Sequence, residues 1–159
     1  MMDRVRRVYL DTSVFGGPFD EDFRGPSDLL FEQIREGRFA LVTSSLVEDE
    51  IGAAPVHVQD LFSEMVALGE LLDPSHEALA LRDAYLEAQI VTAKWAADAL
   101  HVALATVAEC SVLASWNFKH IVHVQKTAAY NSVNAANGHP SIAICTPPEV
   151  IEYDTEEDL

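Results

Sequence analysis

The sequence predicts an α/β protein with three layers, in which a central, mostly parallel sheet is covered by helices on both faces. Short apolar runs alternate along the chain with longer segments of helical periodicity. Strands that alternate with helices in this way form a parallel sheet with a helical layer on each side. A segment at 95–108 that is apolar on nearly every face fits a helix buried in such a layer.

Turn and cap residues separate the elements of the first half. A Pro-Ser-Asp run at 26–28 opens a helix that stops near Gly37, and Ser44 or Ser45 caps a shorter helix. In chain order we expect a strand at 5–10, a Gly-Gly-Pro turn at 16–18, a helix at 26–37, a strand at 39–43 and a short helix that contains Leu46, Val47 and Ile51.

The second half repeats the alternation. Helical periodicity at 55–68 and at 75–89 flanks a possible short strand at 70–73, and the apolar helix follows. After it we expect a strand at 111–115, a polar helical segment at 127–136, an Asn-Gly turn and a last strand at 142–145 before two prolines.

Length and charge limit the possible functions. The 159 residues, 49% of them apolar, predict one globular domain at 1–150 followed by an acidic tail at 151–159. The net charge is −16, from 10 basic and 26 acidic residues. Domains that hold nucleic acid by bulk electrostatics are usually basic, so the charge argues against that class and permits a divalent cation or a basic partner.

Location and redox state follow from two further features. No apolar run reaches the length of a membrane span, and the charged N-terminal residues lead into the first strand without the apolar core of a signal peptide. We therefore expect a cytoplasmic protein with no membrane partner. Cys110 and Cys145 show neither a CxxC nor a zinc-ligand spacing, so we interpret both as reduced core residues.

Asp98 is the first candidate for chemistry, because it stands in the apolar helix with His101 three residues later. A carboxylate where water is scarce persists by protonation, by pairing with a charge or by binding a cation. Lys94, one turn earlier, offers a structural ion pair as the competing explanation. We interpret His101 as a supporting residue, since a hard cation such as Mg²⁺ prefers oxygen ligands.

Other oxygen-bearing side chains stand where strands end. Asp11 and Asn117 directly follow two of the expected strands, and Glu50 lies on the helix after a third. In open α/β sheets the active cleft lies beyond the carboxyl ends of the strands. We therefore expect Asp11, Glu50, Asp98 and Asn117 to meet at one edge of the sheet.

Four segments, at 8–15, 45–51, 97–105 and 113–120, resemble PIN-domain proteins of the kind found as the toxin in VapBC toxin–antitoxin pairs. The most specific motifs are Asp-Ala-Leu-His at 98–101 and Ser-Trp-Asn-Phe-Lys-His at 115–120. The resemblance implies a ribonuclease that depends on Mg²⁺ or Mn²⁺. It also implies RNA as substrate, an antitoxin protein as a possible partner, and a homodimer.

Carried over residue by residue, the resemblance assigns metal binding to Asp11, Glu50 and Asp98. Glu48 is the alternative to Glu50, because a shift of two residues changes the face of that helix. Asn117 stands where many PIN domains keep a fourth acid, and its amide oxygen brings a ligand atom without a charge. Asp11 taken alone also fits a turn or cap residue.

Substrate contacts have less specific candidates. Thr12 and Ser13 fit either a phosphate contact or the positioning of Asp11, and the sequence does not separate these uses. Lys119, His120 and His123 follow Asn117 and fit phosphate contacts or ordinary surface polarity. The acidic surface suits RNA poorly, so the three lysines at 94, 119 and 126 form the expected local basic patch.

Two other classes of function remain open. A phosphatase of the haloacid dehalogenase type needs a second aspartate two residues after the first, where this chain has Ser13. The stronger alternative is a catalytically weakened PIN-fold binding module that acts through a partner protein, which Asn117 and the net charge favour.

Overall fold

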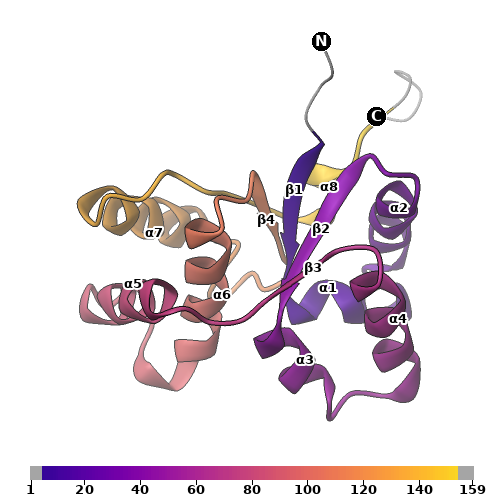
Figure 1. Ribbon diagram of the computed structural model, residues 1–159, viewed down its shortest axis with the longest axis horizontal. Helices are drawn as coiled ribbons and strands as arrows, with labels where there is room; N and C mark the ends of the chain where they lie inside the picture. Colours follow the sequence, from indigo (N-terminus) through magenta and orange to yellow (C-terminus); the bar gives the residue numbers. More distant parts are fainter. Residues whose placement is uncertain (1–4, 154–159) are drawn as a thin grey trace.

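The computed structural model describes residues 5–153, which form a five-stranded sheet between two layers of helices (Figure 1). All four strand pairings are parallel, and the strand order is β3-β2-β1-β4-β5. The strands are β1 (Arg6–Leu10), β2 (Phe39–Ser44), β3 (Glu70–Leu72), β4 (Val112–Ala114) and β5 (Ala143–Cys145). The predicted α/β class and the central parallel sheet are confirmed.

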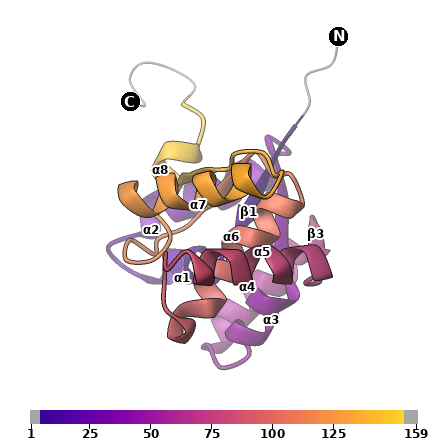
Figure 2. The same ribbon diagram turned by 90° about the vertical axis from the view of Figure 1, so that its left-hand side faces the viewer.

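The helices divide between the two faces of the sheet, as Figures 1 and 2 show from two sides. One face carries α5 (His76–Glu87), α6 (Ala96–Val107) and α7 (Val124–Ala136). The other carries α1 (Thr12–Gly16), α2 (Arg24–Arg35), α3 (Ser45–Ile51), α4 (Val56–Val66) and α8 (Pro147–Val150). Two short 3₁₀ turns, η1 (Gly17–Phe19) and η2 (Ala93–Trp95), complete the set.

Each face of the sheet has its own apolar core. Successive side chains of a strand point to opposite faces, so Val8 and Leu10 pack with α1, α2 and α4, whereas Tyr9 packs with α6. Every residue of α6 from Ala99 to Thr106 is buried, which confirms the helix predicted to be apolar on nearly every face. Full burial of each Val or Leu contributes about 1.5–3 kcal/mol, so this layer is a major source of stability.

The strand order reverses between β1 and β4. The chain moves outward from β1 to β2 and β3, and then returns to place β4 on the other side of β1. Leu10 pairs with Ala114, so the carboxyl ends of β1 and β4 lie side by side. Ligands of open α/β sheets bind where the strand order reverses in this way.

The structure differs from the sequence prediction at several element ends, and it adds two short helices, α1 and α8. A helical turn, α1, follows β1 directly, because the side chain of Asp11 caps it before the glycines are reached. Helix α2 begins at Arg24 rather than at Pro26, and α7 begins at Val124 rather than at 127. A proline is accepted within the first turn of a helix because the N–H it lacks has no intrahelical partner there.

The remaining expectations concern the cysteines, membranes and the C-terminal tail. Cys110 is buried and Cys145 is half-buried, and both are free thiols. No helix within residues 5–153 is long and apolar enough to cross a bilayer.

The backbone of Glu152 is held by the buried side chain of Gln33, which donates to its carbonyl and accepts from its N–H, each at 2.8 Å. Residues 154–159 of the predicted tail lie outside the described residues.

Candidate active site at the carboxyl edge of the sheet

Asp11 links the end of β1 to the start of α1. Its Oδ1 accepts from the Ser13 hydroxyl at 2.6 Å and from the Val14 N–H at 3.4 Å. Only 3% of its surface is exposed, and this burial raises the pKa of Asp11, although His101 and the surrounding donors partly offset the effect. Asp11 is therefore the cap that the sequence allowed, and also a carboxylate whose charge is costly until a cation or proton neutralises it.

Ser115, at the end of β4, contacts Asp11 at the end of β1. The fully buried hydroxyl donates to Asp11 Oδ2 at 2.5 Å and accepts from the Asn117 N–H at 2.9 Å. The next N–H, that of Trp116, donates to Ser13 Oγ at 2.8 Å. The sequence analysis did not identify Ser115 as a site residue. Its position at the end of a strand could have indicated it, because the ends of paired parallel strands lie side by side and β4 pairs with β1.

Glu50 reaches the same edge from the last turn of α3. Its Oε1 accepts from Thr12 Oγ1 at 2.7 Å and lies 2.7 Å from His101 Nε2. Burial alone raises the pKa of Glu50, but the bonds to His101 and Thr12 outweigh it and hold this pKa below its usual value. Glu50 is therefore an ionised, partly exposed carboxylate that two neighbours hold in place.

A buried hydrogen-bond chain runs behind Glu50. His101 Nδ1 lies 2.8 Å from the Tyr9 hydroxyl, which lies 2.8 Å from Ser44 Oγ. With His101 neutral, one assignment satisfies every group: Ser44 donates to Tyr9, Tyr9 donates to Nδ1, and Nε2–H donates to Glu50. His101 thus supports a carboxylate, as predicted, but that carboxylate is Glu50 rather than Asp98 on its own helix.

Asp98 is half-buried, because the first turn of α6 emerges from the core and burial begins only at Ala99. Desolvation raises the pKa of Asp98 and the charge of Glu50 adds to this, while the bond to the Asn117 side chain opposes it. The fully desolvated carboxylate of the site is therefore Asp11, not Asp98. Lys94, the alternative partner, instead has its Nζ 5.2 Å from the ring centroid of Trp95.

Asn117 completes the set of four. Its Oδ1 accepts from the His120 N–H at 3.0 Å, and its side chain lies close enough to Asp98 to lower the pKa of that carboxyl. The structure therefore brings Asp11, Glu50, Asp98 and Asn117 to one edge of the sheet.

The donor set matches a hard divalent cation in chemistry, since it offers three carboxylates and one amide oxygen. The spacing is less favourable: within residues 5–153, no three His, Cys, Asp or Glu side chains are placed to hold one metal ion. Thr12 and His101 hold the carboxylate of Glu50 in its present position. A three-carboxylate metal site therefore requires the acidic side chains to move closer together than they stand.

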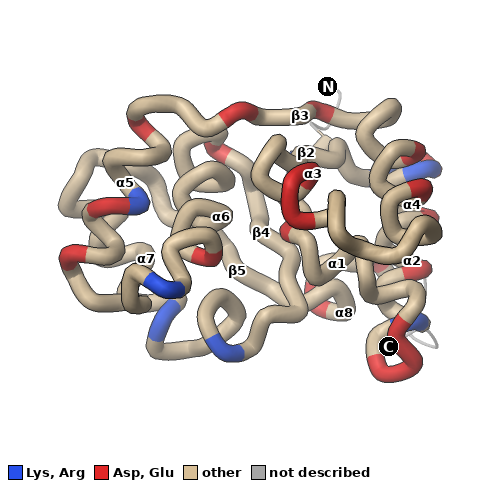
Figure 3. The backbone as a smooth tube through the Cα atoms, turned by 90° about the horizontal axis from the view of Figure 1, so that it is seen from below, with Lys and Arg blue, Asp and Glu red and all other residues tan. Residues whose placement is uncertain are grey.

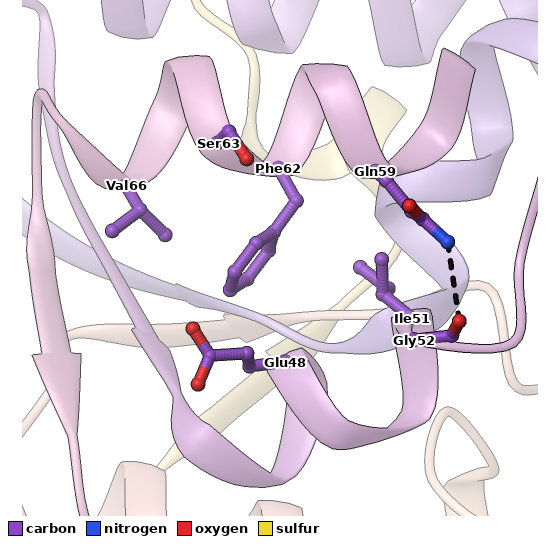
Figure 4. A pocket seen from close by; sticks show the side chains of 7 residues that line it. All are labelled: Glu48, Ile51, Gly52, Gln59, Phe62, Ser63 and Val66. Atoms are coloured by element: carbon purple, nitrogen blue, oxygen red, sulfur yellow. Dashed lines mark hydrogen bonds between the residues drawn. The ribbon is translucent and has the colours of Figure 1, made fainter. Parts of the chain in front are cut away.

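Glu48 occupies a different surface. It lies on α3 beside a pocket of about 260 Å³ that α3 and α4 form, with Phe62 and Val66 opposite (Figure 4). Glu50, two residues further on, is the acid of this helix that reaches Thr12 and His101. The structure thus places Glu50 rather than Glu48 at the carboxyl edge.

The candidate substrate-binding residues differ in how they are engaged. The hydroxyls of Thr12 and Ser13 both hold carboxylates, those of Glu50 and Asp11 respectively. Lys119 is exposed, whereas His120 is buried and stacked on Trp95 with ring centroids 4.4 Å apart. A substrate contact by any of these four residues remains a prediction.

Trp116 and His123 lie beside this region. Trp116 packs mostly as a core residue, as predicted: it stacks on Phe23 with centroids 4.2 Å apart and donates to Ser27 Oγ at 2.9 Å. His123 is exposed at the N-terminus of α7. This position is compatible with both alternatives, a phosphate contact and an ordinary polar surface residue.

Comparison with known proteins finds similarity in structure only. No protein-family model matches the chain, and no curated protein matches it in sequence. Three solved structures share its fold: VapBC2 from Rickettsia felis bound to a promoter DNA fragment, FitAcB from Neisseria gonorrhoeae, and FitAB bound to the IR36 DNA fragment. The fold is PIN-like.

The three likenesses are similar in extent. The TM-scores are 0.56, 0.57 and 0.58, each at 14% sequence identity. The matches cover 88%, 90% and 93% of this chain and 98%, 99% and 99% of the matched chains. A likeness at this identity establishes the three-layer architecture, and the activity has to be argued from the side chains.

Proposed function

We propose that this protein is a metal-dependent endoribonuclease that hydrolyses RNA phosphodiester bonds. The observation that carries the proposal is the buried, ionisable Asp11 where β1 and β4 end side by side, with Asp98, Asn117 and Glu50 at the same edge. Acids concentrated where a sheet changes strand order are unfavourable alone and become favourable around a divalent cation.

In this proposal Asp11, Asp98 and Glu50 hold Mg²⁺ or Mn²⁺. The bound ion supplies two effects: it lowers the pKa of a water and it offsets charge that develops on the phosphate. Ser13 and Ser115 fix both oxygens of Asp11, so that side chain has no rotational freedom to lose when it binds. Asn117 orients Asp98 in the same way, which assigns it a positioning role in place of a fourth charge.

The wider role we propose is that of the toxin in a VapBC-type pair, with an antitoxin protein as its partner and a homodimer as its assembly. Support comes from the shared fold, because the similar chains occur in structures named as VapBC2 and FitAB. A basic antitoxin segment would also be attracted by the net charge of −16. Co-purification with a neighbouring gene product tests the partner, and analytical ultracentrifugation tests the dimer.

A second candidate, a catalytically weakened binding module, is favoured by one observation. Within residues 5–153, no three acidic, His or Cys side chains are grouped closely enough to hold one metal ion as they stand. Calorimetry with Mn²⁺ separates the two candidates. The nuclease proposal predicts saturable binding that Asp11→Asn weakens at least tenfold, whereas a dismantled site would bind no metal at millimolar concentration.

A further inference from the structure

All three lysines of this acidic chain lie near the Trp95–His120 pair. The Nζ atoms of Lys94 and Lys119 lie 5.2 Å and 5.5 Å from the ring centroid of Trp95, although the two lysines come from η2 and from the loop after β4. Lys126, in the first turn of α7, donates to the carbonyl of Ile90 at 2.7 Å. Figure 3, which looks onto this end of the molecule, shows basic segments gathered beside α6 and α7.

These lysines differ from the arginines in how their charges are used. Five of the described arginines are in contact with acidic side chains: Arg6, Arg7, Arg35, Arg38 and Arg82. In contrast, no ion pair within residues 5–153 joins Lys94 or Lys119 to a carboxylate. The cluster is therefore a site of uncompensated positive charge on a protein whose net charge is −16.

The Trp95–His120 stack beneath the lysines is a second, independent observation. The ring planes are inclined by 30° and the imidazole is 8% exposed, yet neither Nδ1 nor Nε2 has a hydrogen-bond partner. Leaving buried polar atoms unpaired is costly, and in native structures such atoms often mark a functional site. The unpaired imidazole nitrogens of His120 thus lower the stability of the fold, and they lie next to the only lysines of the chain.

The cluster adjoins the candidate active site through the chain itself. Asp98 lies one turn beyond Lys94 and Trp95 on the same helical segment, and Asn117 stands two residues before Lys119. A phosphate bound by the two lysines would be followed or preceded along the same strand by a phosphate at the carboxylates. This order suits a chain of regularly spaced phosphates better than a single small anion.

We propose that Lys94, Lys119 and the Trp95–His120 stack form a binding subsite for the phosphate backbone of a nucleic-acid strand, adjacent to the bond that is cleaved. The inference deepens the proposed ribonuclease function, since it names the surface that receives the substrate. Lysine contacts to phosphate supply affinity without reading sequence, and a partly exposed indole offers a stacking face that accepts any base. An acidic protein segment would use the lysines but not the indole.

Binding can be measured without cleavage, in the presence of chelator, with a fluorescein-labelled single-stranded RNA of about ten nucleotides and the full-length chain. Each lysine that contacts a phosphate of a single strand contributes about 0.7 to the slope of log K against log salt. The Lys94→Gln, Lys119→Gln double variant should therefore lower that slope by about 1.4. Arg35→Gln, which removes an exposed cation from α2 on the opposite face, should leave the slope unchanged.

The fluorescence of Trp95 provides the second readout. Trp116→Phe leaves Trp95 as the only indole, and we expect the RNA to quench it, whereas a polyglutamate peptide of equal charge should not. Quenching by both ligands, or a slope that the double variant and Arg35→Gln change equally, would overturn the proposal. Cleavage with Mn²⁺ is assayed separately, so lysine-dependent binding without cleavage would reject the ribonuclease function and leave the subsite standing.

Discussion

Glu50 and His101 lie 51 positions apart in the sequence, and a 2.7 Å contact between Oε1 and Nε2 joins them at the carboxyl edge of the sheet. The contact links a partly exposed acid to a buried chain through Tyr9 to Ser44. It also determines where Glu50 is held relative to Asp11 and Asp98. The role of the Glu50–His101 contact can be tested by changing Tyr9 in the buried hydrogen-bond chain, which leaves Glu50 itself in place.

Tyr9→Phe should impair activity more than its cost in stability explains. The change removes the hydroxyl that holds Nδ1 of His101, so only the contact with Glu50 still positions the imidazole. Cleavage should fall while the free energy of unfolding drops by about 1 kcal/mol. Nitrogen-15 NMR should show a shifted Nδ1 resonance of His101 in the variant, because that nitrogen loses its hydrogen bond, while Nε2 keeps its proton toward Glu50.

Tyr85→Phe is the matched control for Tyr9→Phe. It also removes a buried tyrosine hydroxyl, one that donates to the Asn134 side chain rather than to His101. We expect a similar loss of stability with unchanged cleavage and an unchanged Nδ1 resonance of His101. Equal losses of activity in the two variants would show that Tyr9 acts only through overall stability.

Asp11→Asn should stabilise the metal-free protein at neutral pH. Burial raises the pKa of Asp11 above its value in the unfolded chain, so the folded state binds the proton more tightly. The contribution of Asp11 is then most favourable at low pH and is lost as pH rises through the folded-state pKa. Replacing it should raise the free energy of unfolding by about 0.5–2 kcal/mol at pH 7, as at other destabilising functional positions.

The pH dependence provides the check on that sign. Urea unfolding of wild type and Asp11→Asn, measured from pH 7 down to pH 3, should show the advantage of the variant shrinking as pH falls. An advantage that grows toward low pH, or a variant less stable than wild type at pH 7, would contradict the assigned direction.

Glu50→Gln and Glu48→Gln form a matched pair on α3. If Glu50 contributes a charge to the metal site, Glu50→Gln should reduce the rise in melting temperature that Mn²⁺ produces, because binding to the folded state alone is what raises it. Glu48→Gln, on the pocket between α3 and α4, should leave the rise intact. Identical shifts in both variants would remove Glu50 from the ligand set.

Gly17→Ala should destabilise the loop that supports Ser115. A Cβ at Gly17 would lie 2.1 Å from Ser27 Oγ and 3.0 Å from Trp116 Nε1, which are hydrogen-bonded to each other. Overpacking of this kind costs about 1–3 kcal/mol. A Cβ at Gly16 meets nothing within 4 Å, so Gly16→Ala should be neutral or slightly stabilising, and thermal unfolding of the two variants compares them directly.

The long helices and the ends of the strands can be predicted from the sequence, because they follow from the periodicity of apolar residues. The buried α6, the strands and the positions of Asp11 and Asn117 all depend on local patterns. Helix α1 was not predicted, since its cap is the same Asp11 that the pattern marked as a candidate ligand. An interpretation that assigns each residue a single role does not predict that Asp11 is both a helix cap and a candidate ligand.

The internal connections of the site could not be predicted in the same way. The Glu50–His101 and Asp11–Ser115 contacts join residues 51 and 104 positions apart, and such pairings are set by tertiary packing. The degree of burial was also misjudged for Asp98, because a helix apolar over most of its length still has an exposed first turn. Periodicity predicts on which face of a helix a residue lies, but it does not predict how far that helix extends beyond the core.

The most direct test of the central claim is cleavage of a single-stranded RNA by the purified chain with Mn²⁺, compared between wild type, Asp11→Asn and Glu48→Gln. We predict cleavage by wild type and Glu48→Gln, loss of cleavage in chelator, and a decrease of at least a hundredfold for a correctly folded Asp11→Asn. Cleavage that persists undiminished in Asp11→Asn, or the absence of any Mn²⁺-dependent cleavage in wild type, would contradict the account.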